Sequence, residues 1–189
     1  MLVLFVISIG YLKHQQRGLK VENEQLKKIL SIEKQFAPLE KDANFIFLKD
    51  CKKFIVKDLM GVEIFDPRKV VIKPEFLQKT IVAGRKIETF LRELQTKNPE
   101  LSYLLVIEGN MANRWDHTLN TDSYWGYTTS YQRALAVYNL WIENNINFRK
   151  YNVEVMICGS GFNGLCRDEK EENNKRFSIQ IIPKIENRK

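Results

Sequence analysis

Residues 128–137, TTSYQRALAV, place an arginine where the pattern predicts the first turn of a helix. Thr129 and Gln132 have the spacing of a capping box, in which two side chains bond the free backbone N–H groups of a helix start. That end of a helix carries partial positive charge, so a cation there is unfavourable by about 0.3–1 kcal/mol. Arg133 therefore either points into water, where this cost is small, or helps to hold an anion.

Few other residues have the spacing that catalysis or metal binding requires. The run GSGFNG at residues 159–164 matches the GxGxxG fingerprint of dinucleotide-binding folds, but no helix pattern follows it. The three cysteines lack CxxC spacing and the chain has only two histidines, so we expect neither a metal site nor a cofactor. Asp116 and Asp122 lie in one polar loop, where aspartates commonly form turns. We therefore expect a protein that is not an enzyme.

Cys158 and Cys166 bracket the glycine run. If the domain lies outside the cytoplasm, their thiols can form a disulfide. The alternative is that both thiols are buried and free. The sequence alone leaves both states open.

The composition is that of a folded domain with a net positive charge. The 189 residues are 44% hydrophobic and 11% aromatic, and the formal net charge is +7. This length allows one domain of about 100–150 residues with extensions. A positive charge suits nucleic acid, an anionic membrane surface or a polyanionic wall polymer. Because the lysines are scattered rather than clustered, we expect no nucleic-acid partner.

The N-terminus combines an apolar segment with a polar one. Residues 2–12 are apolar and uncharged, whereas a membrane-spanning helix needs about 20 such residues. We interpret residues 1–12 as a partial transmembrane or membrane-inserted segment and expect the reading frame to extend upstream by about 15–40 residues. Residues 13–45 are rich in Gln, Glu and Lys with a thin apolar stripe, which predicts a helical stalk or linker.

Residues 46–189 have the pattern of an α/β domain. Helices are predicted over residues 74–96, with proline in first position, and 129–143, and a polar loop over residues 110–127. Met60-Gly61 joins the first two of the predicted strands as a hairpin or a bent strand. The predicted strands are FIVKDL (54–59), VEIF (62–65), SYLLVIEG (102–109), VEVMIC (153–158) and RFSIQII (176–182). We expect an α/β (α+β) sandwich, with two helices packed on a mixed sheet of about four strands.

Four patterns occur in an order and spacing that resemble the OmpA-like C-terminal domain, which is also found in MotB-type stator proteins. They are FDPRKVVIKPE before the first helix, LLVIEGN in a strand, TSYQRALAVYNLW in the second helix, and CGSG followed by NNKRFSIQI at the end. The resemblance covers residues 50–185. The VIEG strand and residues 130–133 are similar to those of the MotB-like subunit of the Zorya anti-phage defence system.

The resemblance implies a binding site for the peptide of peptidoglycan. In the family, the arginine of an L-S-x-x-R-A pattern binds the carboxylate of diaminopimelate, and Arg133 matches that arginine. The place of the family's partner aspartate reads GNMA at residues 109–112, and its asparagine is replaced by Gly126, so Asp116 is a candidate substitute acid. The ligand-binding residues implied in this way are Arg133, Asp116, Ser130, Thr129, Asn174 and Arg176. The alternatives are that Arg133 only braces a loop and that Asp116 caps a turn.

By the same resemblance, the chain is a membrane-anchored envelope protein with one span in the inner membrane and its C-terminal domain in the periplasm. It is expected to anchor a MotA/MotB-like or Zorya-like ion-driven complex to peptidoglycan. A MotA-like membrane subunit and a second copy, paired through stalk and domain, are the implied partners. The alternative is an interaction module that has lost wall binding. Such a module would bind a protein partner through aromatic residues of the long loop, namely Trp115, Tyr124, Trp125 and Tyr127.

Overall fold

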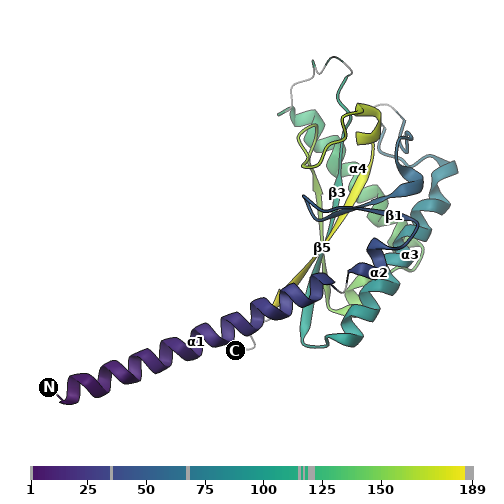
Figure 1. Ribbon diagram of the computed structural model, residues 1–189. Coiled ribbons are helices and arrows are strands. Elements are labelled where there is room, and N and C mark those ends of the chain that lie inside the picture. Colours follow the sequence, from purple (N-terminus) through teal and green to yellow (C-terminus); the bar gives the residue numbers. More distant parts are fainter. Residues whose placement is uncertain are drawn as a thin grey trace. The chain divides into compact units, whose positions relative to one another are not determined.

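The computed structural model of the protein describes residues 2–34, 36–66, 69–114, 116, 118 and 122–185. The chain consists of two compact units, Met1–Ala37 and Pro38–Lys189. In the first unit, α1 (Leu2–Lys34) is one continuous helix of 33 residues (Figure 1). No helix within the described residues is both long enough and apolar enough to cross a membrane. The division of this unit into a membrane segment and a stalk stays a prediction.

The second unit contains a five-stranded mixed sheet in the order β1-β2-β5-β3-β4. Strands β3 and β4 are parallel and the other neighbours are antiparallel. The strands are β1 (Phe45–Leu48), β2 (Lys53–Val56), β3 (Leu101–Gly109), β4 (Val153–Gly159) and β5 (Phe177–Ile185). The helices are α2 (Ala37–Glu40), α3 (Pro74–Lys97) and α4 (Tyr124–Glu143), with the short 3-10 helices η1 (Lys57–Leu59), η2 (Phe148–Tyr151) and η3 (Glu171–Asn174). The predicted mixed α/β fold is confirmed, with five strands instead of about four.

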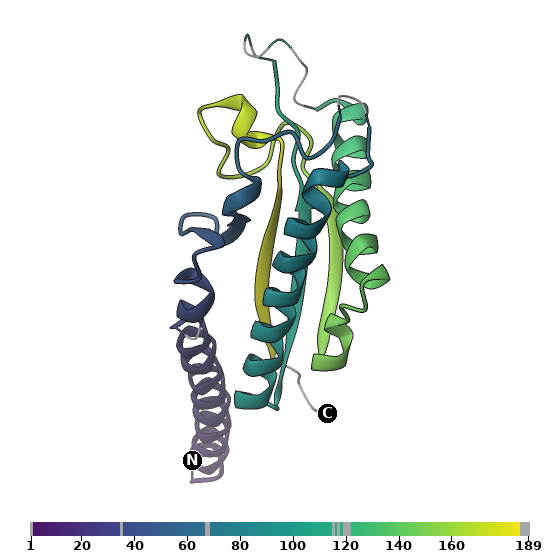
Figure 2. The same ribbon diagram turned by 90° about the vertical axis from the view of Figure 1, so that its right-hand side faces the viewer.

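Helices α3 (teal) and α4 (green) lie side by side over one face of the sheet (Figure 2). Alternate residues of a strand point to opposite faces, and the residues of β3 that share a face with Gly109 are buried against these helices. They are Leu101, Tyr103, Leu105 and Ile107. Trp141 joins the two helices, because its indole N–H donates to the carbonyl oxygen of Thr80 at 2.7 Å. The core therefore fixes α4 against both α3 and the sheet.

The predicted strand VEIF is wrong. In this segment only Phe65 takes part in β pairing, through an isolated bridge with Ile72. The hairpin partner of β2 is β1, which precedes it in the chain, and the other edge of β2 pairs with β5. Both edges of β2 are therefore occupied, and VEIF cannot pair with either of them.

The predicted start of the second long helix at Thr129 is also wrong. Helix α4 begins at Tyr124, and its N-cap is Ser123, whose Oγ accepts a hydrogen bond from the N–H of Gly126. Gly126 suits this helix because a Cβ there would lie 2.7 Å from the ring of Phe162. Thr129 is therefore buried inside α4 instead of capping it, and Arg133 lies beyond the first turns.

Gly109→Ala is expected to destabilise the second unit by about 2–3 kcal/mol, because overpacking against rigid backbone cannot be relieved by a side-chain movement. A Cβ at Gly109 would lie 1.9 Å from the carbonyl oxygen of Ser130 in α4. Urea denaturation measures this loss. Gly18→Ala is the control, since a Cβ at Gly18 meets nothing within 4 Å. Equal midpoints for the two variants would contradict the close contact between β3 and α4.

Candidate functional site

The side chain of Arg133 projects from the middle of α4, and the residue as a whole is 7% exposed. Its Nε donates to the carbonyl oxygen of Lys69 at 3.1 Å, and one Nη donates to that of Asp66 at 3.3 Å. The other Nη donates to the Sδ of Met111 at 3.0 Å. The guanidinium carbon lies 5.0 Å from the centroid of the Phe65 ring. The side chain thus holds the backbone at Asp66 and Lys69 against α4.

Within the described part of the chain, no carboxylate forms an ion pair with Arg133. Burial lowers its pKa, and the charge of Glu63 acts in the opposite direction. A guanidinium has five N–H donors, and the three bonds above leave two of them without a partner among the residues that the structure describes. A buried cation is costly unless an anion pairs with it. The site therefore suits an incoming carboxylate.

Arg133 lines a cavity of about 230 Å³. Its other lining residues are Glu63, Phe65, Met111, Ala112, Trp125 and Lys175. Lys175 forms an ion pair with Glu63, so the cavity presents two cations and one carboxylate. The ring of Trp125 lies 5.9 Å from that of Phe162. This combination of charges can bind a zwitterion, with its carboxylate at Arg133 and its ammonium at Glu63.

The Glu63 carboxyl is expected to titrate below its ordinary pKa of 4.5, chiefly because it accepts a hydrogen bond from Lys175. A lowered pKa in the folded state means that this pair stabilises the fold above pH 4.5 and is lost as the pH falls through the lowered value. NMR titration measures this pKa. Lys175→Met should return it toward 4.5, and an unchanged value would contradict the pair.

Several residues that the sequence predicted as ligand-binding are buried elsewhere. The Oγ of Ser130 donates to the carbonyl oxygen of Tyr127 and accepts from the N–H of Gly161 at 2.9 Å. The side-chain amide of Asn174 accepts a hydrogen bond from the N–H of Asp168 and donates one to its carbonyl oxygen. Arg176 donates to the carbonyl oxygen of Cys166. Neither these residues nor Thr129 line the cavity. Their bonds hold the loop of residues 160–176.

Asp116 is not among the residues that line the cavity. Its carboxylate accepts from the hydroxyl of Thr118 at 2.8 Å and from that residue's N–H at 3.3 Å, and these bonds lower its pKa. The acid that lines the cavity is Glu63, which the sequence did not single out. Glu63 and Lys175 are 112 residues apart, and no local pattern links them. Trp115, predicted for an aromatic interaction surface, lies outside the described residues.

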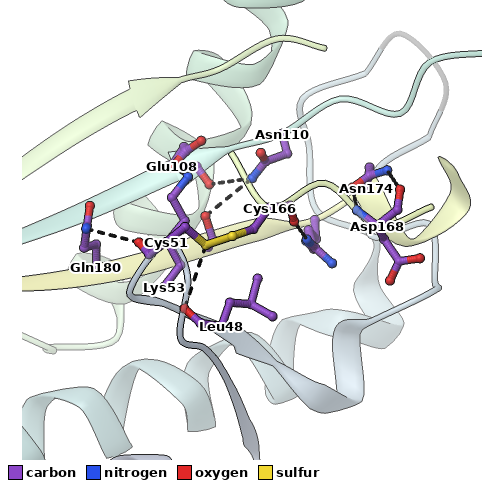
Figure 3. Close-up of a disulfide and its surroundings, with 11 residues drawn as sticks. Leu48, Cys51, Lys53, Glu108, Asn110, Cys166, Asp168, Asn174 and Gln180 are labelled. Carbon is purple, nitrogen blue, oxygen red and sulfur yellow. Dashed lines mark hydrogen bonds and ion pairs between the residues drawn. A yellow bond between two sulfur atoms is a disulfide. The ribbon is translucent and has the colours of Figure 1, made fainter. Parts of the chain in front are cut away.

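A disulfide joins Cys51 to Cys166, and Cys158 is free (Figure 3). Both predicted states, a bond between Cys158 and Cys166 and two free thiols, are therefore wrong. The loop of residues 160–176 carries Cys166 to the turn between β1 and β2, where the Cα atoms of the bonded pair are 6.2 Å apart. Burial raises the pKa of the Cys158 thiol, and Glu108 adds to the effect. No group of three potential metal ligands occurs among the described residues.

No protein-family model matches this sequence, and no curated protein is significantly similar to it. Several solved structures are similar in fold. The periplasmic domain of Helicobacter pylori MotB has 12% identity and a TM-score of 0.42, with 71% of this chain and 76% of that chain covered. The peptidoglycan-associated lipoprotein from Burkholderia pseudomallei has 13% identity and a TM-score of 0.37, with 64% and 86% covered. A putative MotB-like protein from Desulfovibrio vulgaris has 11% identity and a TM-score of 0.40, with 87% and 93% covered.

Proteins of the MotB type, which the sequence patterns resemble, are thus among the solved structures to which this chain is similar. All three TM-scores are below 0.5 and all three identities are below 25%. These similarities therefore carry no conclusion about the function of this chain.

Proposed function

We propose that this chain is an envelope protein whose second unit binds the peptide of peptidoglycan in the cavity at Arg133. The observation that carries the proposal is Arg133, which as a whole residue is 7% exposed and whose guanidinium has no carboxylate partner among the described residues. A ligand carboxylate would accept the two remaining N–H bonds and neutralise the buried charge. The diaminopimelate implied by the sequence resemblance carries a carboxylate and an ammonium on one carbon.

The ammonium of this ligand would bind the carboxylate of Glu63. The side chains of Glu63 and Lys175 are 43% and 37% exposed, so their ion pair is weak enough to exchange for another partner. Lys175, once released, would add a second cation for the carboxylate of the ligand. In this proposal Glu63 takes the role for which the sequence offered Asp116.

The disulfide supports a location outside the cytoplasm. Disulfides persist in oxidising compartments and are rare in the cytosol, where thiols are kept reduced. The Cys51–Cys166 bond therefore agrees with a domain in the periplasm.

We further propose that the protein ties a MotA/MotB-like or Zorya-like complex to the wall. One inner-membrane span would include residues 1–12, and the partners would be a MotA-like subunit and a second copy of this chain. The length of α1 supports this plan, because its 22 residues beyond the proposed span (34 − 12) extend for about 33 Å. Such a helix can separate a membrane anchor from a wall-binding unit.

Calorimetric titration of the full chain with a diaminopimelate-containing muropeptide tests the wall-binding role. We expect saturable binding, and much weaker binding of a muropeptide that has lysine in place of diaminopimelate and therefore lacks the side-chain carboxylate. Absence of binding to both ligands would refute the wall-anchor proposal.

The second candidate function is a protein-interaction module, which one surface feature favours. Tyr124, Tyr127 and Tyr131 follow a helical spacing on α4 and are 85%, 37% and 44% exposed. Exposed tyrosines commonly dominate the binding energy of protein interfaces. In this function Tyr124→Ala would abolish what the protein does in cells, because the protein partner would no longer bind. Variants at Arg133 would retain that cellular function. The opposite outcome favours wall binding.

A further inference from the structure

The loop of residues 160–176 forms part of the wall of the Arg133 cavity. Arg167 donates to the carbonyl oxygen of Met111 at 3.0 Å and pairs with Glu171 at 2.5 Å. The same Glu171 carboxylate accepts from the N–H of Asn113 at 2.7 Å. The loop therefore holds residues 111–113 in place, and it also supplies Lys175 to the cavity. An ordered loop is needed for an ordered cavity.

The Cys51–Cys166 disulfide fastens this loop to the turn between β1 and β2 (Figure 3). Cys166 has a φ of +58°, and Lys52, next to Cys51, has a φ of +53°. Residues other than glycine rarely adopt this left-handed region, and it persists only where surrounding bonds enforce it. Loss of the disulfide would leave both backbone conformations without this restraint.

The disulfide is open to reagents. Cys51 and Cys166 are half-buried. Cys166 lines a cavity of about 370 Å³, whose charged residues are the cations Lys49, Arg167 and Arg176 and the acids Asp50 and Asp168. A small thiol can therefore approach the bond, and its attack at one sulfur releases the other cysteine as a thiolate.

We propose that Cys51–Cys166 is a reversible thiol–disulfide exchange site that controls the order of the Arg133 cavity. One thiolate of an external dithiol attacks the Cys51 sulfur, and Cys166 leaves as a thiolate that takes up a proton. The second thiol of the reagent then attacks the mixed disulfide and releases Cys51, which is protonated in turn. The protein gains two electrons and two protons, and the dithiol is oxidised to a cyclic disulfide.

In the reduced state the loop of residues 160–176 and the cavity wall at 111–113 fluctuate. If the binding arrangement is occupied about one tenth of the time, the apparent Kd of a cavity ligand rises about tenfold. This effect on affinity rests on the proposed function, whereas the change in loop order does not.

The test is to equilibrate the full chain with mixtures of reduced and oxidised dithiothreitol at pH 7. The redox state is read by alkylation and mass spectrometry, and backbone order by hydrogen exchange. In the reduced protein we expect the largest acceleration of exchange at residues 111–113 and 160–176, while β3 stays among the most protected segments and so reports a folded protein. The Kd for a diaminopimelate-containing muropeptide should rise about tenfold. Cys158→Ser is the control and should behave as the wild type.

A disulfide that stays oxidised in excess reduced dithiothreitol would overturn the proposal. So would a reduced protein whose exchange at residues 111–113 and 160–176 is unchanged. If exchange accelerates there but neither redox state binds muropeptide, the exchange site stands and the wall-binding function fails. The Cys51→Ser/Cys166→Ser variant must reproduce the reduced state, and a variant that exchanges like the oxidised protein would also refute the coupling.

Discussion

Replacing Arg133 with methionine is expected to weaken muropeptide binding at least about 30-fold, because truncating one partner of a buried charge pair costs about 2–5 kcal/mol. The same change should leave the melting temperature unchanged or raise it. Methionine has a similar length without the charge, and replacing buried charges by apolar groups is often neutral or stabilising. The released carbonyl groups belong to half-buried Asp66 and exposed Lys69, where water can replace the guanidinium.

Calorimetric titration and thermal unfolding measure the two effects on the same sample. Arg85→Met is the matched control, since Arg85 lies on α3, donates to the carbonyl oxygen of Asn144 at 3.3 Å and is not among the residues that line the cavity. It should change neither affinity nor melting temperature. A variant at Arg133 that binds as tightly as the wild type would show that the guanidinium only braces the backbone at Asp66 and Lys69. A large fall in melting temperature would show that its three bonds outweigh the buried charge.

Removing the disulfide with Cys51→Ala/Cys166→Ala is expected to lower the free energy of unfolding by about 4–5 kcal/mol. The two cysteines are 115 residues apart, and a cross-link over such a long segment greatly restricts the unfolded chain. From the usual stability of about 5–15 kcal/mol this loss leaves about 0–11 kcal/mol, so the variant stays folded only if the wild type lies well above the lower limit.

Urea denaturation with and without the substitutions measures this difference. The midpoint should fall, and the dependence on urea should rise if the unfolded chain becomes more open. Cys158→Ala removes a thiol that takes part in no cross-link, and it serves as the control. A loss below about 1 kcal/mol would show that strain in the native loop cancels the restriction of the unfolded chain.

Local patterns predicted the parts of the fold that depend on local energetics. Pro74 at the first position and apolar residues at helical spacing predicted α3, which runs from Pro74 to Lys97. A continuous apolar run predicted β3, which is Leu101–Gly109. The sequence did not predict the start of α4 at Tyr124, because aromatic residues and Gly126 favour helices poorly. This first part of α4 depends on packing against Phe162, which is 36 residues from Gly126 in the chain (162 − 126).

The same distinction applies to the site. Arg133 stood out in the sequence because its pattern resembles a family motif. The structure retains it as a charged group beside a cavity, but not at a helix start. Glu63 and Lys175 meet only through the tertiary fold, as do Cys51 and Cys166. Pairings over more than 100 residues leave no trace in local spacing. The sequence therefore could not predict that Glu63 is the acid of the cavity or that Cys51 is bonded to Cys166.

The central place of β5 in the sheet has a consequence for how the protein is made. This strand lies between β2 and β3, yet it is the last of the five to leave the ribosome. Until it arrives, β2 and β3 each lack a neighbour, and the sheet cannot close around its core. Pairings between distant segments also form slowly. The second unit would therefore remain unfolded throughout most of its synthesis, and its sheet can close only after β5 has been made.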